Sequence, residues 1–203
     1  MPRVGLNRDR VVSVALDVVD AGGRTGFADL TLAAVASAAG VSTPSLYKHV
    51  PSLAALRRDI AVRAVEETVR TTARATIGRS GPEAVRALGH AIRDYAREHP
   101  GRYAAVQVAA DPDDPDDAPL ADAGADAVAV LAAVVRGAGV ADDRLVDAVR
   151  ILRSAVHGFV TLELDLGFRL PDDLDASFDA LLDVVVTGLA ALGDPVADPP
   201  RHR

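Results

Sequence analysis

The segment AGVSTPSLYKHV, residues 39–50, decides the fold, because one helix must stop in it and another must start directly afterwards. Gly40 is suited to the left-handed conformation that ends a helix. Ser42 or Thr43 can cap the next helix, and Pro44 is tolerated in its first turn, where the amides have no helical partner. The segment therefore predicts two short helices joined by a tight corner.

Helical spacing of apolar residues continues on both sides of this corner. One helix is expected over residues 7–20, a second from a Thr31 cap to Gly40, and a long fourth from a Ser52 cap toward Thr76. Later helices are expected over residues 83–98, through Tyr103, and over residues 120–138, 142–166 and 173–192. No alternating strand pattern is present, so the sequence predicts an all-α protein of about nine helices.

Two segments do not fit a helix. Residues 110–119 contain three prolines among five aspartates, which predicts a mobile, solvated loop. The final residues, 194–203, have the composition of a disordered tail.

Composition excludes several kinds of site. The chain has no cysteine, and therefore no disulfide, thiolate zinc site or cysteine nucleophile. It has no H-E-x-x-H, G-x-S-x-G or P-loop motif, its five histidines lack metal-ligand spacing, and its aspartate cluster lacks the glycine and glutamate of a calcium loop. We therefore expect no enzyme, metal or cofactor.

The longest apolar run, Ala127 to Val135, is far shorter than a membrane span needs. We therefore expect no membrane partner and a cytoplasmic protein. Net charge is unevenly distributed: residues 1–80 hold 11 Lys or Arg against 7 Asp or Glu, a balance of +4, whereas residues 81–203 carry -11. The basic front part permits a nucleic-acid partner.

The second and third expected helices have the size and spacing of a helix-turn-helix, whose second helix enters the major groove of DNA. Leu46 points inward with Val41 and Val50, which leaves the polar side chains of the third helix outside. Tyr47 and Lys48 can each reach a phosphate oxygen. Plain packing in a helical bundle, with these side chains merely solvated, is the alternative.

The stretch from about Arg8 to Glu67 closely resembles the DNA-binding domain of TetR-family transcriptional regulators. The shared features are Gly26-Phe27, Thr31, Ala36, Gly40-Val41-Ser42, Leu46-Tyr47-Lys48-His49 and the Ser-led fourth helix. The resemblance implies a homodimer, usually a repressor, with a C-terminal domain that binds a small molecule. It assigns the DNA surface to Thr31, Ser42, Thr43, Ser45, Tyr47, Lys48 and His49, with Arg3 and Arg8 as further contacts.

The resemblance also divides the chain. A helix-turn-helix domain is expected over residues 1–52, a connecting helix over 53–78, and a ligand-binding and dimerisation domain over 79–193. Residues 150–168 resemble the C-terminal class named for a Trp-His-Gly signature, with His157 and Gly158 present and Val156 in place of the Trp.

Two apolar stripes on the last two expected helices predict a four-helix interface with a twofold copy, with close packing at Gly158 and Gly188. The stripes include Leu152, Val156, Phe159, Phe178, Leu182, Val185 and Leu189. The alternative is that both stripes fill the core of a monomer.

A ligand cavity is expected between residue 78 and these helices. Its candidate lining is His90, Tyr95, Tyr103, Gln107, His157 and Thr161. The alternative is that each of these is a core or surface group.

The function expected is that of a repressor released from a palindromic operator by a small-molecule effector. A helical ligand-binding or scaffold protein without operator affinity is the alternative.

Overall fold

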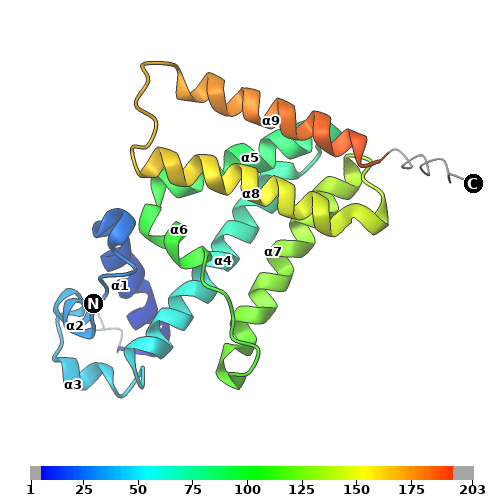
Figure 1. Cartoon of the computed structure of the whole chain (residues 1–203). Coiled ribbons are helices and arrows are strands. Elements are labelled where there is room, and N and C mark those ends of the chain that lie inside the picture. Colours follow the sequence, from blue (N-terminus) through cyan, green and yellow to red (C-terminus); the bar gives the residue numbers. More distant parts are fainter. Residues whose placement is uncertain (1–5, 194–203) are drawn as a thin grey trace, which may run out of the picture. The chain divides into compact units, whose positions relative to one another are not determined.

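The computed structural model describes residues 6–193, and within that range it consists of helices without strands (Figure 1). The all-α prediction is confirmed. The nine α-helices of this range are α1 (Arg8–Ala21), α2 (Leu32–Ala39), α3 (Thr43–Leu46), α4 (Leu53–Thr76), α5 (Gly81–Glu98), α6 (Pro100–Val106), α7 (Ala118–Gly137), α8 (Leu145–Leu164) and α9 (Leu174–Ala191). The predicted disordered tail lies outside the described residues.

Helix ends follow the capping residues of the sequence. The Thr31 hydroxyl accepts a hydrogen bond from the amide of Ala34 at 3.2 Å, and the Ser52 hydroxyl accepts one from the amide of Ala55 at 3.0 Å. Each bond satisfies an amide that has no partner within its helix. The predicted starts of α2 and α4 are therefore confirmed.

Residues 110–119 correct the sequence prediction, because they are ordered. Pro115–Asp117 form a single 3₁₀ turn, and α7 begins directly after it at Ala118. The Asp114 side chain accepts a hydrogen bond from the amide of Asp116 at 2.9 Å, and both Asp114 and Asp117 contact Arg58 of α4. Aspartates in this segment act as helix caps and ion-pair partners. The prediction of a solvated loop did not take these two roles into account.

The described residues divide into two compact units, the first formed by residues 6–71 and 94–127 and the second by 72–93 and 128–193. In the first unit, α1, α2, α3 and α4 share one core. Its fully buried members include Val11, Val35, Leu46, Leu56 and Ile60. The division into DNA-binding, connecting and ligand-binding domains is a functional one and stays a prediction.

The second unit is held together by α5, α8 and α9, whose apolar stripes pack inside the chain. Gly89 of α5 lies so close to Leu182 of α9 that a Cβ atom would sit 2.6 Å from the leucine side chain. Of the seven residues predicted for a dimer interface, six are buried in this core, namely Leu152, Val156, Phe178, Leu182, Val185 and Leu189, and Phe159 is half-buried. These side chains are covered within the chain, so they leave little surface for a second copy, and the residues of the dimer interface stay a prediction.

Three polar side-chain contacts join α5 to α9 at successive helical turns. Arg86 contacts Asp183 at 2.8 Å, His90 contacts Asp179 at 2.9 Å, and Arg93 contacts Asp175 at 2.8 Å. Arg93 is buried and also donates two hydrogen bonds to Glu163 of α8, at 2.7 and 2.8 Å. Bidentate pairing supplies the partners that a buried guanidinium needs.

One helical segment within residues 6–193, Pro115–Gly137, is long and apolar enough by length and composition to cross a membrane. Its alanines account for much of this apolar character, and its first turns pack on α4, where Leu120 and Ala123 meet Ala61 and Val65. In the most apolar 18-residue window of this segment, 22% is buried within the structure.

Candidate nucleic-acid interface

The corner between α2 and α3 is built as the sequence predicts. Gly40 has φ +67°, in the left-handed region, and no atom lies within 4 Å of where its Cβ would stand. Glycine is therefore suited here by conformation and not by lack of space. The amide of Val41 donates to the carbonyl of Ala36 at 3.0 Å, which satisfies the end of α2.

The polar side of α3 faces solvent. Leu46 and Val50 are fully buried, whereas Tyr47, at 55 % exposure, and Lys48 are exposed. Tyr47 and Lys48 directly follow the last residue of α3, and their exposed phenol and ammonium groups are of the kind that contacts phosphate oxygens.

Smaller polar groups surround these two side chains. The hydroxyl oxygens of Ser42 and Ser45 lie 2.8 Å apart, and Thr43 and His49 are half-buried. Thr31, at the start of α2, is exposed. The structure thus leaves all seven residues assigned to the DNA surface at least partly accessible, within one unit.

Arg57 of α4 is a residue that the sequence reasoning missed. It donates to the carbonyl of Ala28 at 2.7 Å, and its guanidinium lies 5.9 Å from the centre of the Phe27 ring. Both contacts hold the turn that leads into Thr31 and α2. The aromatic residue after Gly26 was visible in the sequence, but its cationic partner lies 30 positions later.

Arg8 and Arg3 were expected as further DNA contacts. Arg8 instead forms a bidentate pair with Asp59 of α4, both bonds 2.7 Å long, and the hydrogen bond to Asp59 raises the pKa of the guanidinium. The side chain is still 58 % exposed, so its contact with DNA stays a prediction. Arg3 lies outside the described residues.

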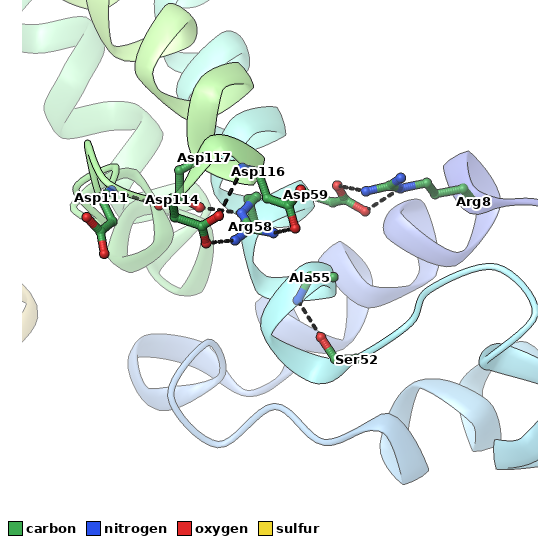
Figure 2. Close-up of polar contacts among 9 residues, drawn as sticks. All are labelled: Arg8, Ser52, Ala55, Arg58, Asp59, Asp111, Asp114, Asp116 and Asp117. Carbon is green, nitrogen blue, oxygen red and sulfur yellow. Dashed lines mark hydrogen bonds and ion pairs between the residues drawn. The ribbon is translucent and has the colours of Figure 1, made fainter.

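Arg58, next in sequence to Asp59, contacts three aspartates of the segment before α7 (Figure 2). It donates to Asp114 at 2.6 Å, lies 3.5 Å from Asp116 and hydrogen-bonds to Asp117. The backbone amide of Asp111 and then Arg58 lower the pKa of the Asp117 carboxyl. We call Arg58, Asp114, Asp116 and Asp117 the Arg58 cluster.

A second polar cluster joins α1, α4, α5 and α6 in the first unit. Arg102 of α6 contacts Asp20 of α1 at 2.7 Å and Glu67 of α4 at 3.0 Å. Tyr95 donates to Glu67 at 3.2 Å, and His99 lies 3.1 Å from Asp20. Burial and the neighbouring Glu67 raise the pKa of Tyr95, which stays protonated and acts as a donor.

The six predicted ligand residues do not share one unit. Tyr95, Tyr103 and Gln107 belong to the first unit, whereas His90, His157 and Thr161 belong to the second. His90 pairs with Asp179, and the His157 ring lies 3.5 Å from the Thr161 hydroxyl. Burial, followed by the nearby Arg153, lowers the pKa of His157, so this imidazole favours its neutral form.

The second unit contains a cavity of about 320 Å³ with a different lining. Small side chains leave the space: the lining consists of Ala73, Thr76, Arg79, Ser80, Gly81, Ala84, Val130, Ala133, Val134 and Gly137. None of the six predicted ligand residues is among them. The sequence signal that was missed is the run of alanines and glycines on α7, which leaves space where larger side chains would fill it.

Two protein-family models match this chain, one in its N-terminal part and one in its C-terminal part. The family model described as bacterial regulatory proteins, tetR family, matches residues 23–60. The model described as tetracyclin repressor-like, C-terminal domain, matches residues 85–185. The second description does not name the Trp-His-Gly class, so that assignment stays a prediction.

Two bacterial relatives match over most of their length. An uncharacterized HTH-type transcriptional regulator of Mycobacterium tuberculosis is 36% identical over 187 residues, covering 92% of this chain and 81% of the relative. The uncharacterized HTH-type transcriptional regulator YobS of Bacillus subtilis is 30% identical, covering 93% and 95%. Both relatives are named as regulators and neither as an enzyme.

Solved structures share the fold. BioQ of Mycobacterium smegmatis superposes with a TM-score of 0.67 at 25% identity, covering 93% of this chain and all of that one. A TetR variant from Acinetobacter baumannii in complex with minocycline has a TM-score of 0.67 at 19% identity, covering 94% of this chain and all of that one. The helix-turn-helix geometry, both family models and the extent of the relatives lead to one conclusion: the chain belongs to the TetR family of bacterial transcriptional regulators.

Proposed function

We propose that the protein is a ligand-responsive repressor that binds a palindromic operator as a homodimer. The observation that carries this proposal is the arrangement of α3, where a fully buried Leu46 anchors the helix and leaves Tyr47 and Lys48 exposed after the Gly40 corner. Two such helices about 34–36 Å apart read successive major grooves on one side of a duplex. A regulator of this kind acts in the cytoplasm, which is the location we propose.

The dimer face that we propose lies opposite the buried stripes of α8 and α9. On α8, Ile151 and Leu162 are exposed and Gly158 is half-buried, while on α9 Val184 and Gly188 are exposed. Apart from the backbone of its own helix and its chain neighbours, nothing among residues 6–193 lies within 4 Å of a Cβ built at either glycine, so both positions are open. Apolar and small side chains at helical spacing allow two helices from each copy to pack closely.

The effector site that we propose is the 320 Å³ cavity of the second unit. Its lining is mostly Ala, Val and Gly, with hydroxyls from Thr76 and Ser80 and the guanidinium of Arg79 at one side. Such a lining suits a small, largely apolar molecule with one polar or acidic group. The TetR variant of related fold binds minocycline, which supports the idea that a protein of this fold accepts a small molecule.

The test is binding to the DNA upstream of the protein's own gene and of neighbouring genes, measured by fluorescence anisotropy. The wild type should bind one near-palindromic fragment selectively. Tyr47→Ala and Lys48→Ala should each weaken this binding about tenfold, because each removes a contact to the DNA backbone. Arg136→Ala removes an exposed cation of the second unit that pairs with Asp142, and it should leave the affinity unchanged.

Two outcomes would contradict the proposal. A wild type that binds none of the fragments selectively, yet binds small molecules, would support the alternative of a helical ligand-binding or scaffold protein. Selective binding that both α3 variants retain in full would show that a different surface contacts the DNA.

A further inference from the structure

Three consecutive side chains near the start of α4 reach three different segments of the first unit. Arg57 holds the turn before α2 through the carbonyl of Ala28, and Asp59 holds the start of α1 through Arg8. Arg58, between them, holds the segment before α7 through Asp114 and Asp117 (Figure 2). One turn of α4 therefore contacts α1, the turn before α2 and the segment before α7.

The segment before α7 depends on Arg58 for its shape. Five aspartates fall within residues 111–117, and their internal hydrogen bonds run to backbone amides: Asp111 N to Asp117 at 2.8 Å, Asp113 N to Asp111 at 2.9 Å, and Asp116 N to Asp114 at 2.9 Å. Five carboxylates within seven residues also repel one another. The Arg58 guanidinium, in contact with three of them, supplies the positive charge around which the segment folds.

Apolar packing also attaches the start of α7. The first turns of α7 meet α4 through Leu120 and Ala123, against Ala61 and Val65, and partly buried valines and alanines pack around these four. Most of these side chains are alanine or valine, so each one buries only a modest apolar area. The Arg58 cluster adds an ionic attachment to this packing.

α7 is one continuous helix from Ala118 to Gly137, and Val130, Ala133, Val134 and Gly137 line the cavity of the second unit. The aspartates of the Arg58 cluster lie directly before the first residue of this helix. Arg58 lies between Arg57 and Asp59 in sequence. A displacement of Arg58 would therefore act on the turn of α4 that contacts α1 and the segment before α2.

We propose that Arg58 is a positioning residue for DNA binding, which links the start of α7 to the orientation of α1, α2 and α3 through Asp114 and Asp117. The inference rests on the proposed function as a DNA-binding regulator. It adds a named link, made of one arginine and an acidic segment, by which a change in α7 reaches the recognition helix.

The first test compares Arg58→Gln with Arg63→Gln in the full-length protein. Arg63 lies on the same helix and has only a 3.8 Å contact with Glu66, so it matches the loss of charge without touching the cluster. Arg58→Gln should lower operator affinity about tenfold, and Arg63→Gln should change it less than twofold. Hydrogen exchange should quicken at the amides of Asp111, Asp113 and Asp116 in Arg58→Gln alone.

The second test separates positioning from simple charge. Asp114→Asn combined with Asp117→Asn removes two negative charges. If these charges only repelled DNA, the double variant would bind the operator more tightly. If they hold Arg58 in place, the double variant should bind the operator more weakly. Arg58→Glu combined with Asp117→Arg restores an ion pair in reverse and should recover most of the affinity lost in Arg58→Glu alone. A variant that merely unfolds would not be rescued in this way.

The outcomes distinguish the two proposals. If the wild type binds operator DNA and Arg58→Gln binds equally well, or if the aspartate variant binds more tightly, the positioning role is overturned and the proposed function stands. If the wild type binds no operator selectively, the proposed function fails, and unchanged exchange in Arg58→Gln would separately overturn the structural role of the cluster.

Discussion

Gly101, the second residue of α6, lies directly on the end of α1. A Cβ atom there would lie 2.4 Å from the carbonyl oxygen of Val19 and 2.8 Å from that of Gly23. Gly26 is similarly confined, with its Cβ position 2.0 Å from the Val19 oxygen. Gly26 could be recognised from its place before Phe27 in the sequence, but Gly101 could not, because the backbone that confines it is about 80 residues away.

Gly101→Ala should lower the free energy of unfolding by about 1–3 kcal/mol, because the backbone carbonyls of α1 and the following turn must move to admit a methyl group. Gly124→Ala is the matched control: Gly124 lies within α7 and has no atom within 4 Å of its Cβ position. That change should stabilise the protein by about 0.5–1 kcal/mol through helix propensity. Urea unfolding followed by circular dichroism measures both, and equal effects of the two substitutions would contradict the confinement of Gly101.

At the scale of helices, the sequence predicted what local chemistry determines. Thr31 and Ser52 mark helix starts, Gly40 marks a stop, and Leu46 identifies the inner side of α3. Contacts between distant positions were not predictable in this way, since Arg58 and Asp114 are 56 residues apart.

The apolar stripes of α8 and α9 show the same limit. Their spacing indicates a covered face, but it does not indicate whether the same chain or a second copy covers it. The structure shows α5 against α9 and α8 packed with α9, so most of the stripe residues are buried within one chain.

The cavity proposed for the effector lies where the ends of α4 and α7 meet the start of α5. Ala84→Phe should fill much of its 320 Å³ without adding charge. Ala125→Phe places the same ring on an exposed position of α7 that does not line the cavity. In a thermal-shift screen of small apolar acids and alcohols, compounds that raise the melting temperature of the wild type should lose this effect in Ala84→Phe and keep it in Ala125→Phe. Retention of every shift in Ala84→Phe would rule out this cavity.

Over the whole molecule, the positive balance of charge and most of the exposed large apolar side chains lie in different parts of the chain. Residues 1–80 carry +4 and contain the helix-turn-helix, whereas residues 81–203 carry -11 and contain the exposed apolar residues of α8 and α9. A basic part attracts the duplex and an acidic part repels it, which favours approach of DNA to the helix-turn-helix. The proposed dimer interface, on α8 and α9, lies in the acidic part of the chain.

Val184→Glu should convert the proposed homodimer to a monomer at micromolar concentration, because it places two carboxylates in the face where α9 meets its copy. Val184 is 70 % exposed in the single chain, so the fold of one copy should be unaffected. Val128→Glu, at an exposed valine of α7, is the control and should leave the assembly intact. Sedimentation velocity measures the assembly, and a dimeric Val184→Glu would place the interface elsewhere.

The attachment of α4 by Arg8–Asp59 and by the Arg58 cluster consists of ion pairs that are partly open to solvent. Ionic strength therefore acts on this protein twice. Added salt reduces the gain from releasing counterions when DNA binds, and it also screens the pairs that hold the helix-turn-helix in place. The slope of log affinity against log salt concentration would then overstate the number of phosphates contacted. Part of that slope would report the weakening of ion pairs within the protein.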